Sequence, residues 1–111
     1  GRRTVVSDEQ IQRAADVLRR EAPPGSDVYL FGSYAKGTAR PDSDVDFLVV
    51  EDEVRDRLEE MFRLRKAIEP VLGDRVLPVD IIVMRRERFE RKKFVLTTLA
   101  NEAARDGRRF G

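Results

Sequence analysis

Residues 30–50 read LFGSYAKGTARPDSDVDFLVV and are the most informative stretch of this sequence. The apolar run Val28 to Phe31 predicts a short strand, which Gly32 ends. A loop rich in Gly, Ser, Thr and Pro follows over residues 32–43, with room for one helical turn. Val45 to Val50 then predicts a second strand, whose Val45, Phe47 and Val49 share one face and form part of a core.

One helix is predicted before this stretch and another after it. Ser7 to Gln10 resembles a capping box, and the apolar spacing after it predicts a helix that ends at about Glu21, before two prolines. A charged amphipathic helix is predicted to begin at Asp52 or Glu53 and to end at Pro70 or Gly73. Its inward positions are Val54, Leu58, Met61, Leu64 and Ile68.

The C-terminal part predicts a third strand and a last helix. The strand covers Val76 to Met84, although Pro78 makes its first residues an edge or a bend. The helix runs from about Glu87 to Gly107, and residues 108–110 allow a short edge segment after it. The apolar stripe of this helix is Val95, Leu96, Leu99 and Ala103. Strands interleaved with helices predict an α/β or α+β domain, with a small mixed sheet and helices packed against it.

Three acidic side chains lie where carboxylates are unfavourable unless a cation is present. Asp44 and Asp46 share one face of a strand and repel each other. Asp80 lies in the otherwise apolar run 79–83, where an unpaired carboxylate is costly if it is buried. If the two strands are neighbours, the three side chains can hold Mg²⁺, which prefers carboxylates together with substrate phosphates. Such a cluster can hold two ions, which stabilise in-line displacement at phosphorus.

The loop after the first strand has the composition of a phosphate site. Gly32 lets the backbone approach a ligand closely, and the Ser33 hydroxyl and the following amides can donate to phosphate oxygens. A helical turn starting here would add its N-terminal dipole. Gly37 permits a second tight turn, and Lys36 and Arg40 are the nearest cations for a triphosphate.

Gly32-Ser33, ten intervening residues and then Asp44-Val45-Asp46 resemble the signature of the DNA polymerase beta-like nucleotidyltransferase superfamily. The position of Gly37, Ser43 just before the first aspartate, and a third acidic strand at Asp80 are similar too. The resemblance covers nearly the whole chain, whose short length and element order look like those of the minimal nucleotidyltransferases. Many of these are antitoxins paired with HEPN-domain ribonuclease toxins. One departure is Tyr34, at a position where such proteins often have Arg.

The resemblance implies a nucleotidyltransferase fold and a role for each matching residue. Asp44 and Asp46 would bind Mg²⁺, and Asp80 would complete the metal site and orient or deprotonate the attacking hydroxyl. The residues that would bind the nucleotide are Gly32, Ser33, Lys36, Gly37 and Ser43. The reaction would be attack on the α-phosphorus of ATP, transferring AMP and releasing pyrophosphate. The acceptor would be a tyrosine of a cognate HEPN-type toxin, held in a hetero-oligomer.

The composition excludes several kinds of chemistry. The 111 residues predict one domain over 1–111, and the absence of Cys and His excludes disulfides, Cys/His zinc sites, thiol nucleophiles and imidazole mechanisms. A net charge of +1 gives no field that would attract nucleic acid or an anionic membrane, so neither is an expected partner. No apolar run approaches the roughly 20 residues that span a bilayer, and no signal-peptide core follows the N-terminus. We therefore expect a cytoplasmic protein.

Each candidate also has a plain structural interpretation. Asp44 and Asp46 could form a solvated strand edge, Gly32-Ser33 an ordinary turn, and Asp80 a carboxylate bound by backbone amides. The basic run Arg85 to Lys93 is either a solvated helix face or a docking surface for an acidic partner or RNA. Two other functions remain open. One is an antitoxin that acts by occlusion without catalysis, and the other is a nucleotidyltransferase acting on RNA or a small molecule within a hetero-complex.

Overall fold

The computed structural model describes residues 6–41, 43–72 and 79–110. Its elements in chain order are α1 (Asp8–Glu21), β1 (Asp27–Phe31), α2 (Ser33–Lys36), β2 (Val45–Glu51), α3 (Arg57–Leu72), β3 (Val79–Arg85), α4 (Arg86–Lys92), α5 (Leu99–Asp106) and β4 (Arg108–Phe110). Across these described ranges, no helix is both long enough and apolar enough to cross a membrane.

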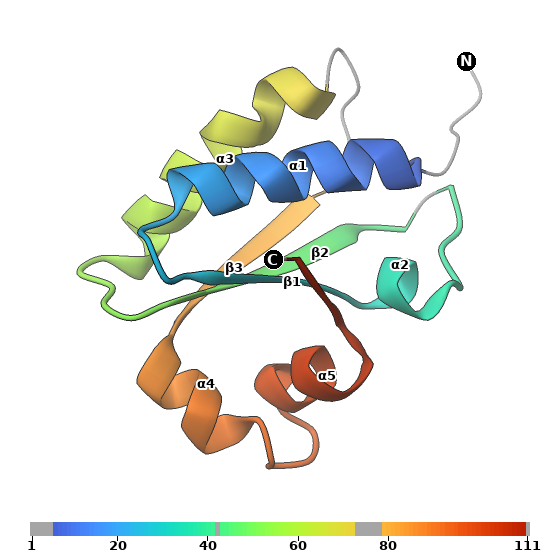
Figure 1. Cartoon of the computed structure of the whole chain (residues 1–111). Helices are drawn as coiled ribbons and strands as arrows, with labels where there is room; N and C mark the ends of the chain where they lie inside the picture. Colours follow the sequence, from blue (N-terminus) through green and yellow to red (C-terminus); the bar gives the residue numbers. More distant parts are fainter. Residues whose placement is uncertain (1–5, 42, 73–78, 111) are drawn as a thin grey trace.

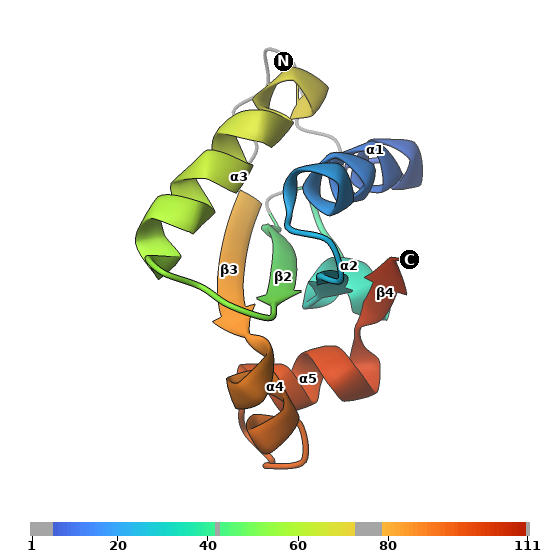
Figure 2. The same cartoon turned by 60° about the vertical axis from the view of Figure 1, so that its left-hand side comes forward.

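The strands form one mixed sheet in the order β3-β2-β1-β4. β2 pairs antiparallel with β1 and parallel with β3, while β4 pairs antiparallel with β1 as the short edge segment that residues 108–110 allowed. Figures 1 and 2 show α1 and α3 on one face of the sheet, and α4 and α5 on the other. This architecture confirms the predicted fold class, a small mixed sheet with helices packed against it.

β2 is an interior strand whose two faces are both buried. Val45, Phe47 and Val49 pack in one apolar cluster with residues of α1 and α3, as predicted. Leu48 and Val50 pack in a second cluster with residues of α4 and α5. Because side chains alternate along a strand, residue 46 faces the α4–α5 layer and residue 51 faces the α1–α3 layer.

α1 begins and ends where the sequence predicts. The Ser7 hydroxyl accepts from the Gln10 N–H at 3.1 Å, and the Gln10 side chain accepts from the Ser7 N–H at 3.2 Å. These two bonds form the predicted capping box. The helix ends at Glu21, where the N–H of Ala22 donates to the carbonyl of Leu18 at 2.8 Å.

α3 begins at Arg57, later than the predicted start at Asp52 or Glu53. Asp56 explains the late start, because its carboxylate accepts from the Glu59 N–H at 3.1 Å in the manner of an N-cap. The inward orientation predicted for Leu58 is wrong, since this side chain is 61% exposed. Leu58 lies in the first turn of the late-starting helix, where Glu60 is the side chain that packs toward Glu51.

The other apolar positions of α3 agree with the prediction. Leu64 and Ile68 are buried, and Val54 and Met61 pack against the same cluster. Pro70 lies inside the helix, which continues to Leu72, so Pro70 does not end it. β3 begins within the predicted strand, and the predicted residues 76–78 lie outside the described part of the chain.

The single C-terminal helix predicted over residues 87–107 is wrong, because two helices, α4 and α5, are present instead. Thr98 separates them. Its hydroxyl accepts from the Asn101 N–H at the start of α5 and donates to the carbonyl of Lys92 at the end of α4. Of the predicted apolar stripe, Ala103 is buried, whereas Val95 and Leu96 are exposed in the connecting turn.

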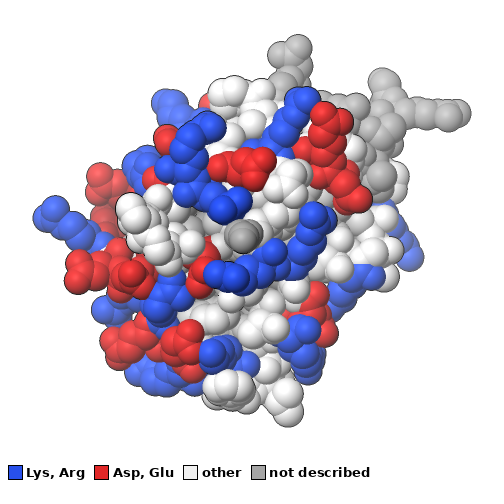
Figure 3. Space-filling model, in the orientation of Figure 1, with Lys and Arg blue, Asp and Glu red and all other residues white. Residues whose placement is uncertain are grey.

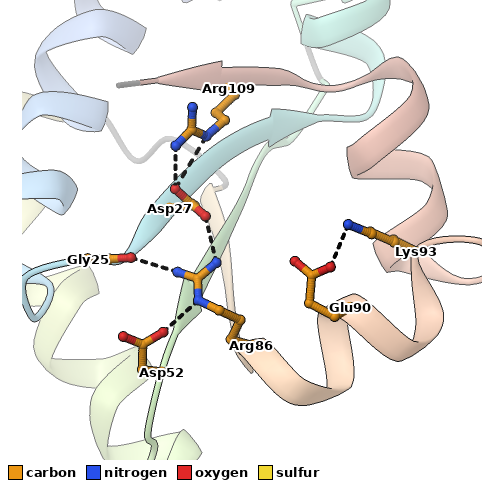
Figure 4. Close-up of polar contacts among 7 residues, drawn as sticks. All are labelled: Gly25, Asp27, Asp52, Arg86, Glu90, Lys93 and Arg109. Atoms are coloured by element: carbon orange, nitrogen blue, oxygen red, sulfur yellow. Dashed lines mark hydrogen bonds and ion pairs between the residues drawn. The ribbon is translucent and has the colours of Figure 1, made fainter.

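An arginine of α4 ties three segments together at one end of the sheet (Figure 4). Arg86 donates to Asp27 of β1 at 2.8 Å, to Asp52 at 2.5 Å and to the carbonyl of Gly25 at 2.6 Å. Arg109 of β4 donates to the same Asp27 at 2.7 Å. Partial burial acts to raise the pKa of Asp27, but the hydrogen bonds from the two arginines outweigh it and lower the pKa. This network fixes the end of the sheet that lies opposite Asp46.

Candidate active site

The three predicted metal ligands meet at one end of β2. Asp46 lies opposite Phe31 of β1 and opposite Asp80 of β3 in the strand register. Asp44 directly precedes β2, and one carboxylate oxygen from each of the three aspartates lies within 4.8 Å of the other two. The parallel pairing of β2 and β3 therefore brings Asp80 beside the other two. Asp44 and Asp80 are exposed and Asp46 is half-buried, so the cluster is open to solvent.

The cluster concentrates negative charge and fits a magnesium ion. Partial burial and the charges of Asp80 and Asp44 raise the pKa of the Asp46 carboxyl to about 6. Oxygen ligands lie about 2.0–2.1 Å from Mg²⁺, so two ligands of one ion are about 3–4 Å apart. Since the oxygens lie within 4.8 Å of one another, a closure of less than about 2 Å brings them to that spacing, and carboxylate oxygens are of the kind that Mg²⁺ prefers.

Gly32 provides the surface against which the Asp46 carboxylate packs. Its φ of +77° is rare for residues with a side chain. A Cβ atom at this position would lie 2.4 Å from Asp46 Oδ2. Glycine is therefore required both by the backbone conformation and by the approach of the Asp46 side chain.

The predicted helical turn in the loop is α2. Gly32 starts it by accepting from the N–H groups of Ala35 and Lys36, each at 3.1 Å. Gly37 ends it in the left-handed conformation, with φ +75°, and its N–H donates to the carbonyl of Ser33. This confirms the second tight turn predicted at Gly37 and fixes the backbone of the loop that carries Ser33.

Tyr34 has a structural role in this loop. Its hydroxyl accepts from the N–H of Val6 at 3.0 Å, and its ring packs against the core cluster under α1. Tyr34 thereby holds α2 to the N-terminal end of α1. This contact occupies the side chain at the position where the sequence departs from the resemblance described above.

Lys36 and Ser43, the other predicted nucleotide-binding side chains, both have protein partners. Lys36 Nζ lies 3.3 Å from Glu102 Oε1 of α5. The Ser43 hydroxyl accepts from the Arg40 N–H at 2.8 Å and closes the turn just before Asp44. A hydroxyl that accepts one hydrogen bond can still donate one, so Ser43 keeps a donor for a ligand.

Glu102 belongs to this region although no sequence motif points to it. Its charge adds to those that raise the pKa of Asp46, and it pairs with Lys36. A hollow of about 440 Å³ is lined by Lys36, Thr97, Thr98, Leu99, Asn101, Glu102 and Arg105. Only the packing of α5 beside the sheet brings Glu102 close to Asp46, so spacing along the chain could not predict it.

Comparisons with known proteins point to one family. The model of the nucleotidyltransferase domain family matches residues 11–106. A toxin–antitoxin structure with AMP-PNP is similar, with a TM-score of 0.56 and 24% identity over 88% of this chain and 70% of that chain. A mutant of the toxin–antitoxin MntA-HpeT has a TM-score of 0.56 and 20% identity over 94% of this chain and 72% of that chain. Comparison with curated proteins gives no match.

A third similar structure is spectinomycin adenyltransferase from Enterococcus faecialis with ATP and spectinomycin. It has a TM-score of 0.56 and 27% identity over 74% of this chain, but this chain spans only 35% of that protein. The structural likenesses support the nucleotidyltransferase fold, and the family match covers most of the chain. The resemblance seen in the glycine turn and the three aspartates is thus confirmed, and the chain belongs to the nucleotidyltransferase domain family.

Proposed function

We propose that this nucleotidyltransferase transfers AMP from ATP, in the presence of Mg²⁺, to a tyrosine hydroxyl of a cognate HEPN-type ribonuclease toxin. Nucleotidyl transfer is the chemistry of the family, and the nucleotide, the acceptor and the partner are our proposal. The observation that carries it is the pairing of Asp46 with Asp80, with Asp44 within 4.8 Å and the Gly32 turn alongside.

In this proposal the three aspartates hold one or two Mg²⁺ ions. Bound Mg²⁺ would neutralise charge on the phosphates and stabilise the charge that develops during displacement at phosphorus. Gly32 and Ser33 would bind the triphosphate through the loop backbone and the serine hydroxyl, with Gly37 keeping the loop tight. Lys36 would exchange its ion pair with Glu102 for a phosphate, and Ser43 would donate from its hydroxyl.

The transfer is a single displacement. The acceptor oxygen attacks the α-phosphorus and forms a new P–O bond, while the bond to the oxygen that bridges the α- and β-phosphates breaks. Pyrophosphate leaves with the electron pair of that bond, and the acceptor proton passes to the Asp80 carboxylate. Asp80 suits this role because it is exposed and lies across from Asp46.

Two observations support an acceptor delivered by another protein. Asp44 and Asp80 are exposed, so a large acceptor can approach the carboxylates directly. Solved proteins of the same fold include toxin–antitoxin complexes, one of them with AMP-PNP. A tyrosine on a partner's surface meets both conditions.

The test is label transfer from ATP labelled at the α-phosphate. The purified chain, Mg²⁺ and the purified product of the neighbouring gene are incubated together, and the label is located by mass spectrometry. We expect label on a tyrosine of that product, lost with Asp46→Asn or Asp80→Asn and retained with the matched control Asp8→Asn in the exposed first turn of α1. Label confined to RNA or a small molecule, or unchanged labelling by Asp46→Asn, would contradict the proposal.

A second candidate function is neutralisation of the toxin by binding alone. Tyr34 supports it, because the side chain at this position is bonded to Val6 and leaves one phosphate contact fewer than an arginine would offer. Co-expression with the toxin separates the two functions. If occlusion is sufficient, Asp46→Asn protects cells as well as the wild-type chain does, and if catalysis is needed, protection is lost.

A further inference from the structure

The turn between α4 and α5 holds three consecutive large apolar side chains in solvent. Phe94 is 81% exposed, Val95 47% and Leu96 67%. At the lower edge of the view in Figure 3, white atoms, which belong to uncharged residues, lie where Figure 1 places this turn. Single exposed apolar residues are ordinary, but a run of three is unfavourable unless it has a function.

Side-chain hydrogen bonds hold this turn in one conformation. The Thr98 hydroxyl lies 2.9 Å from the carbonyl of Lys92 and 2.8 Å from that of Val95, and Asn101 donates to the carbonyl of Lys93 at 2.8 Å. Thr97 has φ +72°, an unfavourable conformation for a β-branched residue, which persists only where the surroundings fix it. The exposed apolar side chains therefore lie on a turn whose conformation is fixed by hydrogen bonds.

The helix beside the turn adds charge of both signs, with positive charge in excess. Residues 87–93 contain four cations and two anions. Arg88 and Arg91 are exposed, and so are Glu87 and Glu90. Lys93 pairs with Glu90 at 2.5 Å, as Figure 4 shows, and its Nζ lies 5.2 Å from the centre of the Phe94 ring. The surface combines an apolar tip with a mainly basic flank.

The turn also borders the candidate active site. Thr97 and Thr98 line the same hollow as Lys36 and Glu102. Lys36 belongs to the predicted triphosphate loop, and its Nζ lies 3.3 Å from Glu102 Oε1 across this hollow. A molecule bound on the turn would therefore be held beside the predicted triphosphate loop.

We propose that residues 93–98 and the exposed face of α4 form the docking surface for the protein that carries the acceptor hydroxyl, and that they bind a segment of it with apolar and acidic side chains. This inference rests on the proposed function, because it names where the acceptor protein approaches. The excess of positive charge over residues 87–93 complements the acidic side chains of such a segment, and the apolar turn complements its apolar ones. Position favours the acceptor protein over a membrane or RNA, because Thr97 and Thr98 of the turn line the same hollow as Lys36 of the predicted triphosphate loop.

The test measures binding of the purified product of the neighbouring gene by calorimetry. The double variants Phe94→Ser/Leu96→Ser and Arg88→Glu/Arg91→Glu should each weaken binding by at least about tenfold, since exposed aromatic and arginine anchors dominate such interfaces. The matched control is Leu58→Ser/Phe62→Ser on α3, whose side chains are 61% and 63% exposed on the other face of the sheet, and it should bind like the wild type. Circular dichroism melting verifies that every variant is folded.

The outcomes separate this inference from the proposed function. If both turn variants lose binding and the wild-type chain transfers no label, the docking surface is kept and the AMP transfer is rejected. Wild-type affinity in the turn variants, or loss of affinity only in the α3 control, would reject the docking surface. RNA and vesicles containing phosphatidylserine serve as further probes. Binding of the wild-type chain to either of these in place of the protein, or to none of the three, would also reject it.

Discussion

Glu51→Gln is predicted to stabilise this protein at neutral pH. Glu51 ends β2, is only 2% exposed and faces α3. Within the described part of the chain its Oε2 has no hydrogen-bond partner. The neighbouring carboxyl is that of Glu60, which Arg63 contacts at 2.7 Å. Burial first, and then the hydrogen bond and charge of Glu60, raise the pKa of Glu51 to about 8.

The size of the effect follows from linkage between protonation and folding. The ordinary pKa of this group is 4.5, so between pH 4.5 and 8 the folded protein holds a proton that the unfolded chain has released. The stability that depends on this proton is fully present below pH 4.5 and is lost as the pH rises to 8. Each pH unit in this range costs about 1.4 kcal/mol, which gives about 3 kcal/mol at pH 7 and about 5 kcal/mol above pH 8.

Glutamine has the shape of a protonated carboxyl, donates an amide N–H to Glu60 and does not ionise. The free energy of unfolding in urea should therefore rise by about 3 kcal/mol at pH 7 and by less than about 1 kcal/mol at pH 5. The exposed neighbour Glu53→Gln should change it little at either pH. A Glu51→Gln variant no more stable than the wild type at pH 7, or a difference equal at pH 5 and pH 8, would refute this reasoning.

Three further predictions concern the site and the network that supports the sheet. Gly32→Ala should lower the free energy of unfolding in urea by about 1–3 kcal/mol, because alanine is strained at this positive φ. The variant should also lose the stabilisation by Mg²⁺, since its Cβ displaces the Asp46 carboxylate, and an unchanged response to Mg²⁺ would contradict this. Asp46→Asn should raise the melting temperature of the metal-free protein and abolish the increase that Mg²⁺ produces in the wild type, and a persisting increase would place the ion elsewhere. Arg86→Gln should lower the free energy of unfolding in urea by about 2 kcal/mol, since it removes charged hydrogen bonds to Asp27 and Asp52. The exposed control Arg88→Gln should leave it unchanged, and equal effects of the two variants would show that the Arg86 network contributes nothing specific.

The carboxylate cluster could be predicted from the sequence because its members lie in strands. Asp44 and Asp46 are two residues apart at the start of an apolar run, and Asp80 is a charged residue in another such run. One parallel pairing between the two strands is sufficient to bring the three together, and β2 and β3 pair in that way. Gly32 could be predicted for the same local reason, since it follows a strand directly and precedes a polar turn.

The C-terminal helices could not be predicted because side-chain capping there overrides an apolar period. The spacing of Val95, Leu96, Leu99 and Ala103 favours one continuous helix. The Thr98 hydroxyl instead bonds to the end of α4 and the start of α5, which breaks the helix. The break exposes the first two members of the stripe and leaves Glu102 beside the aspartates, a position set by tertiary packing.

β2 carries a carboxyl with a raised pKa near each end, Asp46 at its start and Glu51 at its end, and the surroundings of the two differ. Asp46 has two further carboxylates beside it and is open to solvent, so a divalent cation can enter and relieve the repulsion. Glu51 is buried beside α3 with Glu60 as its neighbour, and both conditions favour the protonated carboxyl. The repulsion at Asp46 destabilises the metal-free chain and favours metal binding, because the same energy is released when the ion enters. At Glu51 the neighbour that raises the pKa is a second carboxyl, that of Glu60, so a neutral side chain at this end of β2 stabilises the fold and leaves the three aspartates at the other end unchanged.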